Sequence, residues 1–433
     1  MVARTRNGVG PTDDGQIVRQ TSIRSYGPLG RWPILRNTDF MLLWSGQTVS
    51  VLGNQVSSIA LPLLVLALTG SAVQAGAVSA VRLLPYTVLF LPAGAMIDRW
   101  NRRVVMMLAD TLRGVALGAV PIAFFSGHLA MWLLYTAVLA EGTGFVFYTI
   151  AQIASLPRIV ANEQLAPATA MNEGSHSFGT LVGPGLGGWI VSLGRTVVSG
   201  AIFGVSVDAI SYFASVLSLA FIRTSFQAQR TAATAAPLVQ QIQSGLVFLL
   251  RHPHLRVLAL LGANIGLFII PADLAAIVLS RNELHFSAQV IGLIFSAGGL
   301  GALIGSAVAP WFKRRFKLSH VTYLAVTVEG LSVAAMAVTS SAVVLGAGML
   351  VETMMIPIYN VSQATYRLRL IPDELQGRVN SVIRLFPVAS QPAGVAVAGV
   401  LIGVVGPRPV LAVIAAGLIA SSLLVRLTSL RNV

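Results

Sequence analysis

The sequence predicts an all-α protein that crosses a membrane with twelve helices, arranged as two six-helix pseudo-repeats. Three observations lead to this fold class. Twelve apolar stretches follow one another from Phe40 to Leu427, hydrophobic residues make up 55% of the 433 residues while charged residues make up 10%, and the basic residues gather on one side of the stretches. An ordinary soluble domain carries roughly 25% charged residues. Little chain remains for a soluble domain, so the protein is expected to work inside the bilayer.

Each apolar stretch has about the length that a membrane requires. A hydrocarbon core of ~30 Å is crossed by roughly 20 apolar residues in a helix. The predicted spans are residues 41–67, 75–97, 104–125, 130–154, 168–193, 199–222, 256–280, 288–311, 318–340, 342–366, 379–404 and 409–427.

The formal net charge of +14 is interpreted as a signal of membrane topology. Of the 29 Lys and Arg residues, 23 lie in the N-terminal tail or around the loops on its side of the membrane, and three lie on the other side (Arg195, Arg281 and Arg408). Short loops rich in basic residues mark the cytoplasmic side. Both termini are therefore expected in the cytoplasm, with the protein in the inner or plasma membrane. A nucleic-acid partner is not expected, because it would require basic residues and aromatics clustered on a folded domain.

The spans and the connections between them predict four parts. Residues 1–37 are polar and lack the apolar segment of a signal peptide, which predicts a disordered cytoplasmic tail. Residues 38–222 and 256–433 form the two helix bundles, and 223–255 form a cytoplasmic linker. Helical spacing of apolar residues in that linker predicts an amphipathic helix on the membrane surface, at Leu238, Ile242, Leu246, Leu249 and Leu250.

The two bundles repeat each other weakly at an offset of 211 residues. The matched pairs are Gly94 with Gly305, Trp100 with Trp311, Arg103 with Arg314, Glu141 with Glu352, Tyr148 with Tyr359 and Gln152 with Gln363. Two homologous six-helix halves are typical of secondary transporters, whose binding site lies near the midplane between the halves.

Short motifs resemble those of a known family. The segment after the second span reads Gly94-Ala-Met-Ile-Asp98-Arg99-Trp-Asn-Arg102-Arg103, and it is similar to the loop signature G-x-x-x-D-R-x-x-R-R of the major facilitator superfamily. Gly179, Gly183 and Pro184 in the fifth span resemble the glycine signature G-x-x-x-G-P-x-x-G-G of its antiporter branch. Other segments are similar to the branch of the macrolide exporters and the enterobactin exporter, namely Trp44-Ser-Gly-Gln47, Leu68-Thr-Gly-Ser71 and Gly377-Arg378-Val-Asn380. The resemblance implies the major facilitator fold.

Both signatures suggest conformational gates. Asp98 with Arg99, Arg102 and Arg103 would form a charge cluster that closes the cytoplasmic mouth, next to Gly94 where helices could approach closely. The alternative is that these arginines only anchor the loop among lipid headgroups. If the cluster is a latch, Asp98→Asn should strongly reduce transport while the protein stays in the membrane.

The glycine signature has two interpretations as well. The resemblance implies that Gly179, Gly183 and Pro184 form a pliable helix contact that prevents leakage during antiport. Plain helix packing is an equal alternative for Gly187 and Gly188.

Acidic residues inside the spans are the leading candidates for coupling, because an unpaired charge at the midplane costs on the order of 3 kcal/mol or more. Glu141 shares one helix face with Tyr148 and Gln152, and Glu352 repeats this face with Tyr359 and Gln363. The resemblance implies that both faces line the central cavity. We expect Glu141 to bind a proton or cation there, with Glu352 in a weaker role.

Further polar residues have less definite roles. Asn54 and Gln47 of the first span are expected at the same cavity, and Asp273 is equally compatible with a gate and with a structural pair. Asp110 is predicted to pair with Arg113 at i+3. Asp208 and Glu329 are expected to form hydrogen bonds between helices.

Nucleotide-binding, hydrolase and metal motifs are absent from the sequence, as are cysteines, so no enzyme activity, cofactor or metal is expected. The favoured interpretation is a monomeric secondary transporter in the lipid bilayer. It would export hydrophobic or amphipathic small molecules, of drug, macrolide, siderophore or secondary-metabolite type, by alternating access in exchange for protons. An uptake symporter of the same fold and a non-transporting membrane sensor or scaffold remain alternatives.

Overall fold

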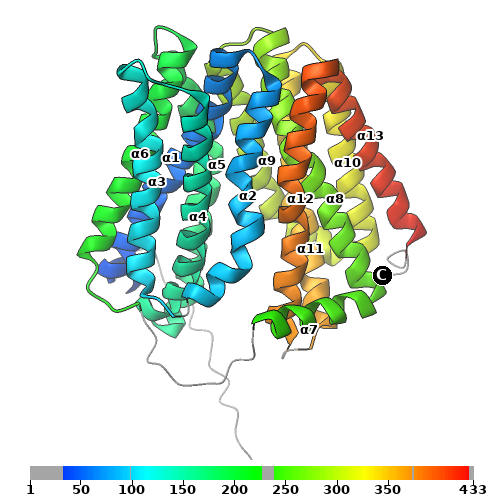
Figure 1. The fold of residues 1–433 in the computed structure, drawn as a ribbon. Coiled ribbons are helices and arrows are strands. Elements are labelled where there is room, and N and C mark those ends of the chain that lie inside the picture. The colour runs from blue at the N-terminus through cyan, green and yellow to red at the C-terminus, as the bar shows by residue number, and fades with distance from the viewer. Residues whose placement is uncertain (1–32, 98, 227–237, 373–374, 429–433) are drawn as a thin grey trace, which may run out of the picture.

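The computed structural model describes residues 33–97, 99–226, 238–372 and 375–428, and all regular elements in these ranges are helical (Figure 1). The first six long helices are α1 (Thr38–Thr69), α2 (Ala72–Ile97), α3 (Arg102–Phe125), α4 (Met131–Ile159), α5 (Leu165–Ser192) and α6 (Val197–Phe221). The second six are α8 (Pro253–Val278), α9 (Ala288–Arg315), α10 (Leu318–Val338), α11 (Ala342–Leu370), α12 (Gln376–Val405) and α13 (Pro407–Leu427). The shorter α7 (Leu238–Arg251) lies between the two sets, and single turns form η2 (Pro33–Arg36), η3 (Asn162–Gln164) and η4 (Leu279–Glu283).

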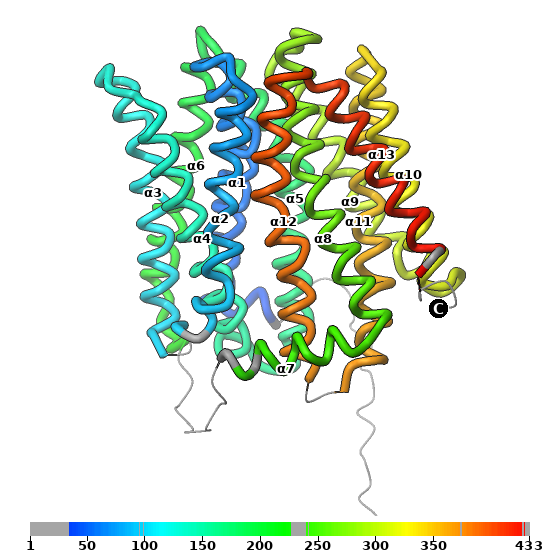
Figure 2. Tube along the Cα trace, turned by 45° about the vertical axis from the view of Figure 1, so that its right-hand side comes forward, coloured from blue at the N-terminus to red at the C-terminus, as the bar shows by residue number. Residues whose placement is uncertain are grey.

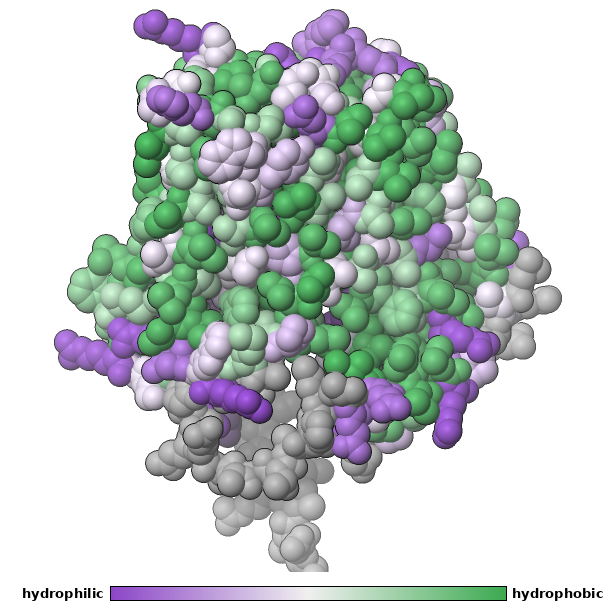
Figure 3. Space-filling view, viewed as in Figure 1, coloured by the Kyte–Doolittle hydropathy of each residue, from purple (hydrophilic) through white to green (hydrophobic). Residues whose placement is uncertain are grey.

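Each of the twelve predicted spans falls on one long helix, which confirms the predicted fold class. Within the described residues, eleven of these helices are long and apolar enough to cross a membrane. The twelfth, α5, is 28 residues long and lies between α1 and α9, but it carries more polar residues and glycines. Figure 3 shows the consequence at the surface, where a broad hydrophobic band separates hydrophilic residues at the two ends of the molecule.

The two sets of six helices pack in the same pattern. In the first set α1 contacts α5 and α6, α4 contacts α2 and α3, and α3 contacts α6. The equivalent helices of the second set, seven positions later in the order α8 to α13, make the corresponding contacts. The contacts between the sets are also paired, since α5 packs on α9 and α12 packs on α2. The weak sequence repeat therefore corresponds to a true repeat of helix packing.

The short helix α7 lies across one end of the bundle, below α8 and α12 in Figures 1 and 2. We call this the α7 end, and the opposite end the far end. A Cβ atom at Gly245 would lie 2.7 Å from the carbonyl oxygen of Arg378, so α7 rests directly on the start of α12. Leu249 is buried in this contact, whereas Leu246 and Leu250 stay exposed. The linker sequence predicts a helix in this segment, and its place on the membrane surface stays a prediction.

The two halves approach each other most closely toward the far end. Gly76 of α2 meets Gly399 of α12, where an added Cβ would lie 2.8 Å from the Gly399 Cα atom. On the opposite side, a Cβ at Gly188 of α5 would lie 2.3 Å from the carbonyl oxygen of Ala288. Because glycine has no side chain, these positions let the backbones of α2 and α12, and of α5 and α9, come into direct contact at this end.

The start of the chain is ordered slightly earlier than the sequence indicates. Residues 1–32 of the predicted tail lie outside the described residues, but 33–36 form η2. Ile34 is buried there against the base of α1, and the Asn37 side chain accepts a hydrogen bond of 3.0 Å from the Phe40 amide. An N-cap and one buried apolar residue are enough to order this short segment.

Candidate functional site

Glu141 lies buried inside the first half, held by two arginines. Arg82 of α2 donates from Nε to one carboxylate oxygen at 2.7 Å, and Arg113 of α3 donates to the other at 3.2 Å. The same Arg82 donates to the Asn54 side chain of α1 at 3.1 Å. Four helices thus meet at one carboxylate that is 1% exposed. Two charge-assisted hydrogen bonds favour the ionised carboxylate and fix its position.

Arg113 has a second set of partners within the same cluster. It donates to Asp110 at 3.0 Å, as the i+3 spacing predicts, and to the Tyr212 hydroxyl of α6 at 2.8 Å. The centre of its guanidinium group lies 3.9 Å from the centroid of the Tyr212 ring, a cation–π distance. Both arginines of this cluster, Arg82 and Arg113, are therefore paired with acids within the protein.

Glycines on α4 make this cluster sterically feasible. A Cβ at Gly142 would lie 2.1 Å from the Arg82 carbonyl oxygen, and one at Gly144 would lie 2.5 Å from the Arg113 Cγ atom. Positions 142 and 144 must be glycine, because only then can α2 and α3 approach α4 closely enough for their arginines to reach the Glu141 carboxylate. The Glu141-Gly142-Thr-Gly144 segment is thus built around the two arginines.

The acids of the second half lie in a different environment. Glu352 of α11 is 2% exposed, and one of its carboxyl oxygens has no hydrogen-bond partner. Its charged neighbours are the acids Asp273 of α8 and Glu329 of α10. In the described part of the chain, none of the three forms an ion pair or a hydrogen bond, so the interhelical bond expected for Glu329 is not found. Asp208 does lie against α1, where a Cβ at Gly53 would be 2.8 Å from its Oδ1 atom.

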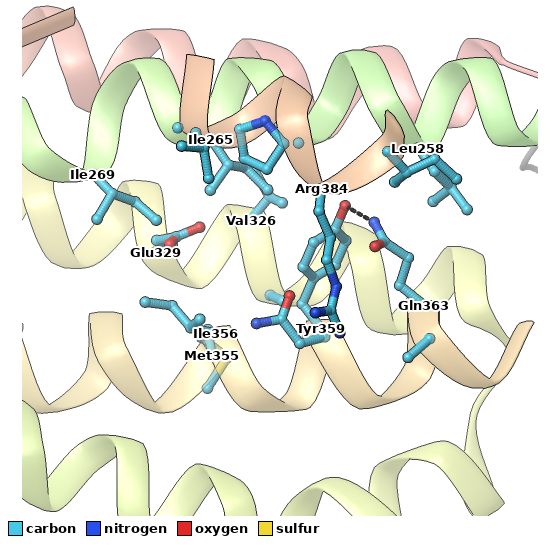
Figure 4. Close-up of a pocket in the computed structure, with 18 of the residues that line it drawn as sticks. Leu258, Ile265, Ile269, Val326, Glu329, Met355, Ile356, Tyr359, Gln363 and Arg384 are labelled. Carbon is cyan, nitrogen blue, oxygen red and sulfur yellow. Dashed lines mark hydrogen bonds between the residues drawn. The ribbon is translucent and has the colours of Figure 1, made fainter. Parts of the chain in front are cut away.

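On α4 and on α11, the predicted polar face is buried together with its acid. On α4, Gln152 donates to Gln47 of α1 at 2.5 Å, and Tyr148 is buried close by. On α11, Gln363 donates to the hydroxyl of Tyr359 (Figure 4). The repeat therefore extends to the side chains, but only the first half places basic residues against its acid.

Three cavities accompany these residues. The N-half pocket, of about 690 Å³, is lined by Gln47, Asn54, Tyr148, Gln152, Glu173, His176 and neighbours on α1 and α3–α5. The C-half pocket, of about 460 Å³, is lined by Glu329, Tyr359, Gln363, Arg367, Arg384 and neighbours on α8 and α10–α12. The central pocket, also about 460 Å³, lies between the halves and is lined by Arg82, Asp273, Thr180, Thr353, Ile356 and neighbours.

The loop signature between α2 and α3 bonds to helix ends of its own half. Arg102 donates to the Ala154 carbonyl at 2.7 Å, and Arg103 donates to those of Leu219 and Ala220 at 2.9 and 2.5 Å. The carbonyls of Leu219 and Ala220 belong to the last turn of α6, where cations are stabilised by the helix dipole, and that of Ala154 lies near the end of α4. Arg99 is exposed.

Two other members of that signature bear on the predicted latch. Asp98 lies outside the described residues. A Cβ at Gly94 would have nothing within 4 Å, so the close helix approach expected there is not present in this conformation.

The glycine signature of α5 serves two different contacts. Gly179 and Gly183 face α1, where an added Cβ would lie 2.6 Å from a Val51 methyl carbon and 2.3 Å from the Gln55 Cβ. Pro184 presents its carbonyl oxygen to α9, 2.4 Å from the position of a Cβ at Gly292. One side of the signature therefore packs within the first half, and the other side joins the two halves.

Three charged residues of the site have no predicted role in the sequence analysis, namely Arg82, Glu173 and Arg384. The repeat offset could have revealed the last two, because Glu173 plus 211 positions is Arg384, and both line pockets in equivalent helices.

The fold and these cavities together define a class of protein. Twelve membrane helices in two related halves, with pockets inside and between the halves that carry some polar side chains, are the architecture of a secondary transporter rather than of an enzyme. A family profile described as the Major Facilitator Superfamily matches residues 43–390. The chain therefore belongs to the major facilitator superfamily, and it is a multi-pass membrane transporter.

Relatives with assigned names support this classification. The multidrug efflux pump Tap of Mycolicibacterium fortuitum is 30% identical over 379 residues, which cover 84% of this chain and 89% of Tap. Macrolide efflux protein A of Streptococcus pyogenes is 22% identical over 357 residues, which cover 82% of this chain and 87% of that protein. Among solved structures, the nucleoside transporter NupG has the same fold, with a TM-score of 0.73 at 13% identity over 90% of this chain and 98% of NupG.

Proposed function

We propose that the protein exports amphipathic small molecules from the cytoplasm by alternating access. The far end is sealed by backbone contacts between α2 and α12 and between α5 and α9, whereas the N-half and C-half pockets lie toward the α7 end. A transporter in this state receives its substrate from the α7 side. The similarity to two named efflux proteins and the glycine signature of α5 favour export over uptake.

The orientation in the membrane is part of this proposal. The predicted excess of basic residues lies on the α7 side, which we assign to the cytoplasm of a cell that carries the protein in its inner or plasma membrane. A fluorescent protein that matures only in the cytoplasm should then fluoresce when it is fused after Val433. A dark fusion, combined with activity of a periplasmic reporter at the same site, would reverse the orientation.

We propose proton antiport as the driving reaction, with Glu352 and Asp273 as the proton-carrying pair. The observation behind this assignment is the contrast between the halves. Glu141 is held by two guanidinium groups, so its loss of charge would leave Arg82 without an ionised partner and Arg113 with Asp110 alone. Glu352 and Asp273 have no such partner, and a buried carboxyl without a counter-charge can gain or lose a proton without breaking an ion pair. Asp273 lines the central pocket, which gives the pair a route to substrate and water.

The assignment can be tested in proteoliposomes with an imposed pH gradient. Export of a fluorescent amphiphile should accelerate with the gradient in the wild type and collapse with a proton uncoupler. Glu352→Gln should bind the amphiphile normally but lose the dependence on the gradient. Glu163→Gln, which changes an exposed acid of η3, is the matched control and should behave as the wild type.

Two outcomes would contradict parts of the proposal. Gradient-driven export by Glu352→Gln at the wild-type rate would remove Glu352 from the coupling reaction, and the same result for Asp273→Asn would remove the pair. Uptake of the amphiphile into cells that express the protein would replace export by symport. We further propose that the monomer is the transporting unit, since all three pockets are formed within one chain.

A further inference from the structure

The C-half pocket contains two arginines that no acid compensates. Arg384 of α12 and Arg367 of α11 both line this cavity of about 460 Å³. Within the part of the chain that the structure describes, neither arginine side chain forms an ion pair or a hydrogen bond. This contrasts with Arg82 and Arg113 of the first half, which are both bound to Glu141.

The position of Arg384 directs it into the cavity. Arg384, Pro387, Val388 and Gln391 all line the pocket, and their spacing of three, four and seven residues defines one face of α12. Arg384 is exposed on this face, which lies inside a helix long and apolar enough to cross the membrane. A charge in such a helix is costly unless it is paired or wetted, and it therefore marks a functional site.

Arg367 adds a second positive charge to the same space. Its side chain is 9% exposed, and its Nε atom is buried without a hydrogen-bond partner. Its charged neighbour is Arg384, so the two guanidinium groups repel each other across the pocket. An anion between them would remove the repulsion and provide the missing hydrogen-bond acceptor.

The rest of the pocket suits an amphipathic molecule. Figure 4 shows Arg384 beside Tyr359 and Gln363, while Ile269, Met355 and Ile356 lie toward the other end of the cavity, together with Glu329. The donors Arg384 and Gln363 thus lie toward one end of the pocket, together with Leu258, and most of the labelled apolar side chains lie toward the other. An arginine fork matches planar or tetrahedral oxyanions better than a lysine would, since it can donate two parallel hydrogen bonds.

We propose that the C-half pocket binds the anionic group of an amphipathic substrate, a carboxylate, sulfonate or phosphate, on Arg384 and Arg367. The apolar body of the substrate lies against Ile269, Met355 and Ile356. This inference rests on the proposed export function and narrows its substrate class.

The first half offers no equivalent site. At the position of Arg384 in the repeat, α5 carries Glu173, which is exposed and lines the N-half pocket. The arginine of that pocket, Arg113, is already bound to Asp110 and Glu141. The two halves thus present opposite charges at equivalent positions, and an anion is attracted to only one of them.

The proposal can be tested by binding of two probes that differ in one group. Anilinonaphthalene sulfonate and phenylnaphthylamine share the same aromatic skeleton, and only the first carries an anion. Both become fluorescent in apolar surroundings, so saturable binding to the full protein in nanodiscs is measured above empty nanodiscs. Arg384→Gln should weaken binding of the sulfonate by roughly tenfold or more, as expected for loss of a charged hydrogen bond, and change that of the neutral probe less than about twofold.

Three control variants complete the experiment. Arg384→Lys keeps the charge and should recover part of the affinity for the sulfonate. Arg369→Gln removes an exposed arginine of α11 that does not line the pocket, and Glu173→Gln removes the charge at the equivalent position, so neither should weaken sulfonate binding. If Arg384→Gln binds neither probe, it has failed to fold, and Arg367→Gln is tested in its place. The same selective loss of sulfonate binding is expected for Arg367→Gln.

The outcomes separate this inference from the proposed function. Equal weakening of both probes by Arg384→Gln, or unchanged sulfonate binding in both Arg384→Gln and Arg367→Gln, overturns the anion site. Export of both probes is measured separately, in proteoliposomes. If the wild type exports a probe but the arginine variants show no selective loss of sulfonate binding, export is upheld and the anion site is rejected. If the variants show the selective loss but the wild type exports neither probe, the anion site is upheld and export is rejected.

Discussion

Replacing Glu141 by glutamine is expected to destabilise the protein, because the change strands positive charges inside the first half. The carboxylate is 1% exposed and accepts from Arg82 at 2.7 Å and from Arg113 at 3.2 Å. Glutamine keeps the shape of the side chain but not its charge. Removing one partner of a buried ion pair costs about 3–5 kcal/mol.

The structure places the expected loss at the lower end of this range. Arg113 retains Asp110 at 3.0 Å, and Arg82 retains the Asn54 oxygen at 3.1 Å and lines the central pocket. We therefore expect Glu141→Gln to lower the free energy of unfolding by about 3 kcal/mol. Glu352→Gln should change it by less than about 1 kcal/mol, because no partner of Glu352 is lost.

The difference can be measured by reversible unfolding in mixed micelles, followed by fluorescence of the six tryptophans. A double variant, Glu141→Gln with Arg82→Gln, should recover part of the loss, since one stranded cation is removed with its partner. A Glu141→Gln protein as stable as the wild type would refute the reasoning. Greater destabilisation by Glu352→Gln than by Glu141→Gln would also do so.

Three further predictions concern the gates. The side chains of Ser192 and Gln289 form a hydrogen bond of 2.8 Å across the far end, and the chain has no native cysteine. A short thiol cross-linker should therefore join the two cysteines of a Ser192→Cys, Gln289→Cys variant. Transport should stop until the link is cleaved. Gly188→Val should lower the yield of that cross-link several-fold, because its Cβ would lie 2.3 Å from a backbone oxygen of α9; an unchanged yield would count against the seal. Arg103→Gln should lower the free energy of unfolding by about 1–2 kcal/mol, because two hydrogen bonds to the end of α6 are lost. Arg99→Gln should leave the free energy of unfolding unchanged. Equal values for the two variants would argue against this role of Arg103.

The sequence by itself determined the membrane spans, the repeat and the family resemblance. Each of these depends on local information: the length of an apolar stretch, the helical spacing of its polar residues, or a short motif. All twelve spans fall on helices for this reason, and Asp110 could be paired with Arg113 because the two are one turn apart on α3.

Only the tertiary structure decided what surrounds each acid. Helical periodicity shows that Glu141 and Glu352 occupy equivalent faces, but it does not show what each face meets. The partners of Glu141 are 59 and 28 residues away on other helices, whereas Glu352 meets only other acids among its charged neighbours. The same applies to Arg384, whose orientation into a cavity depends on how α12 packs against α8 and α2. The energy of a charge in a membrane is set by its partners and by access to water, and both are properties of the packed helices rather than of any one segment.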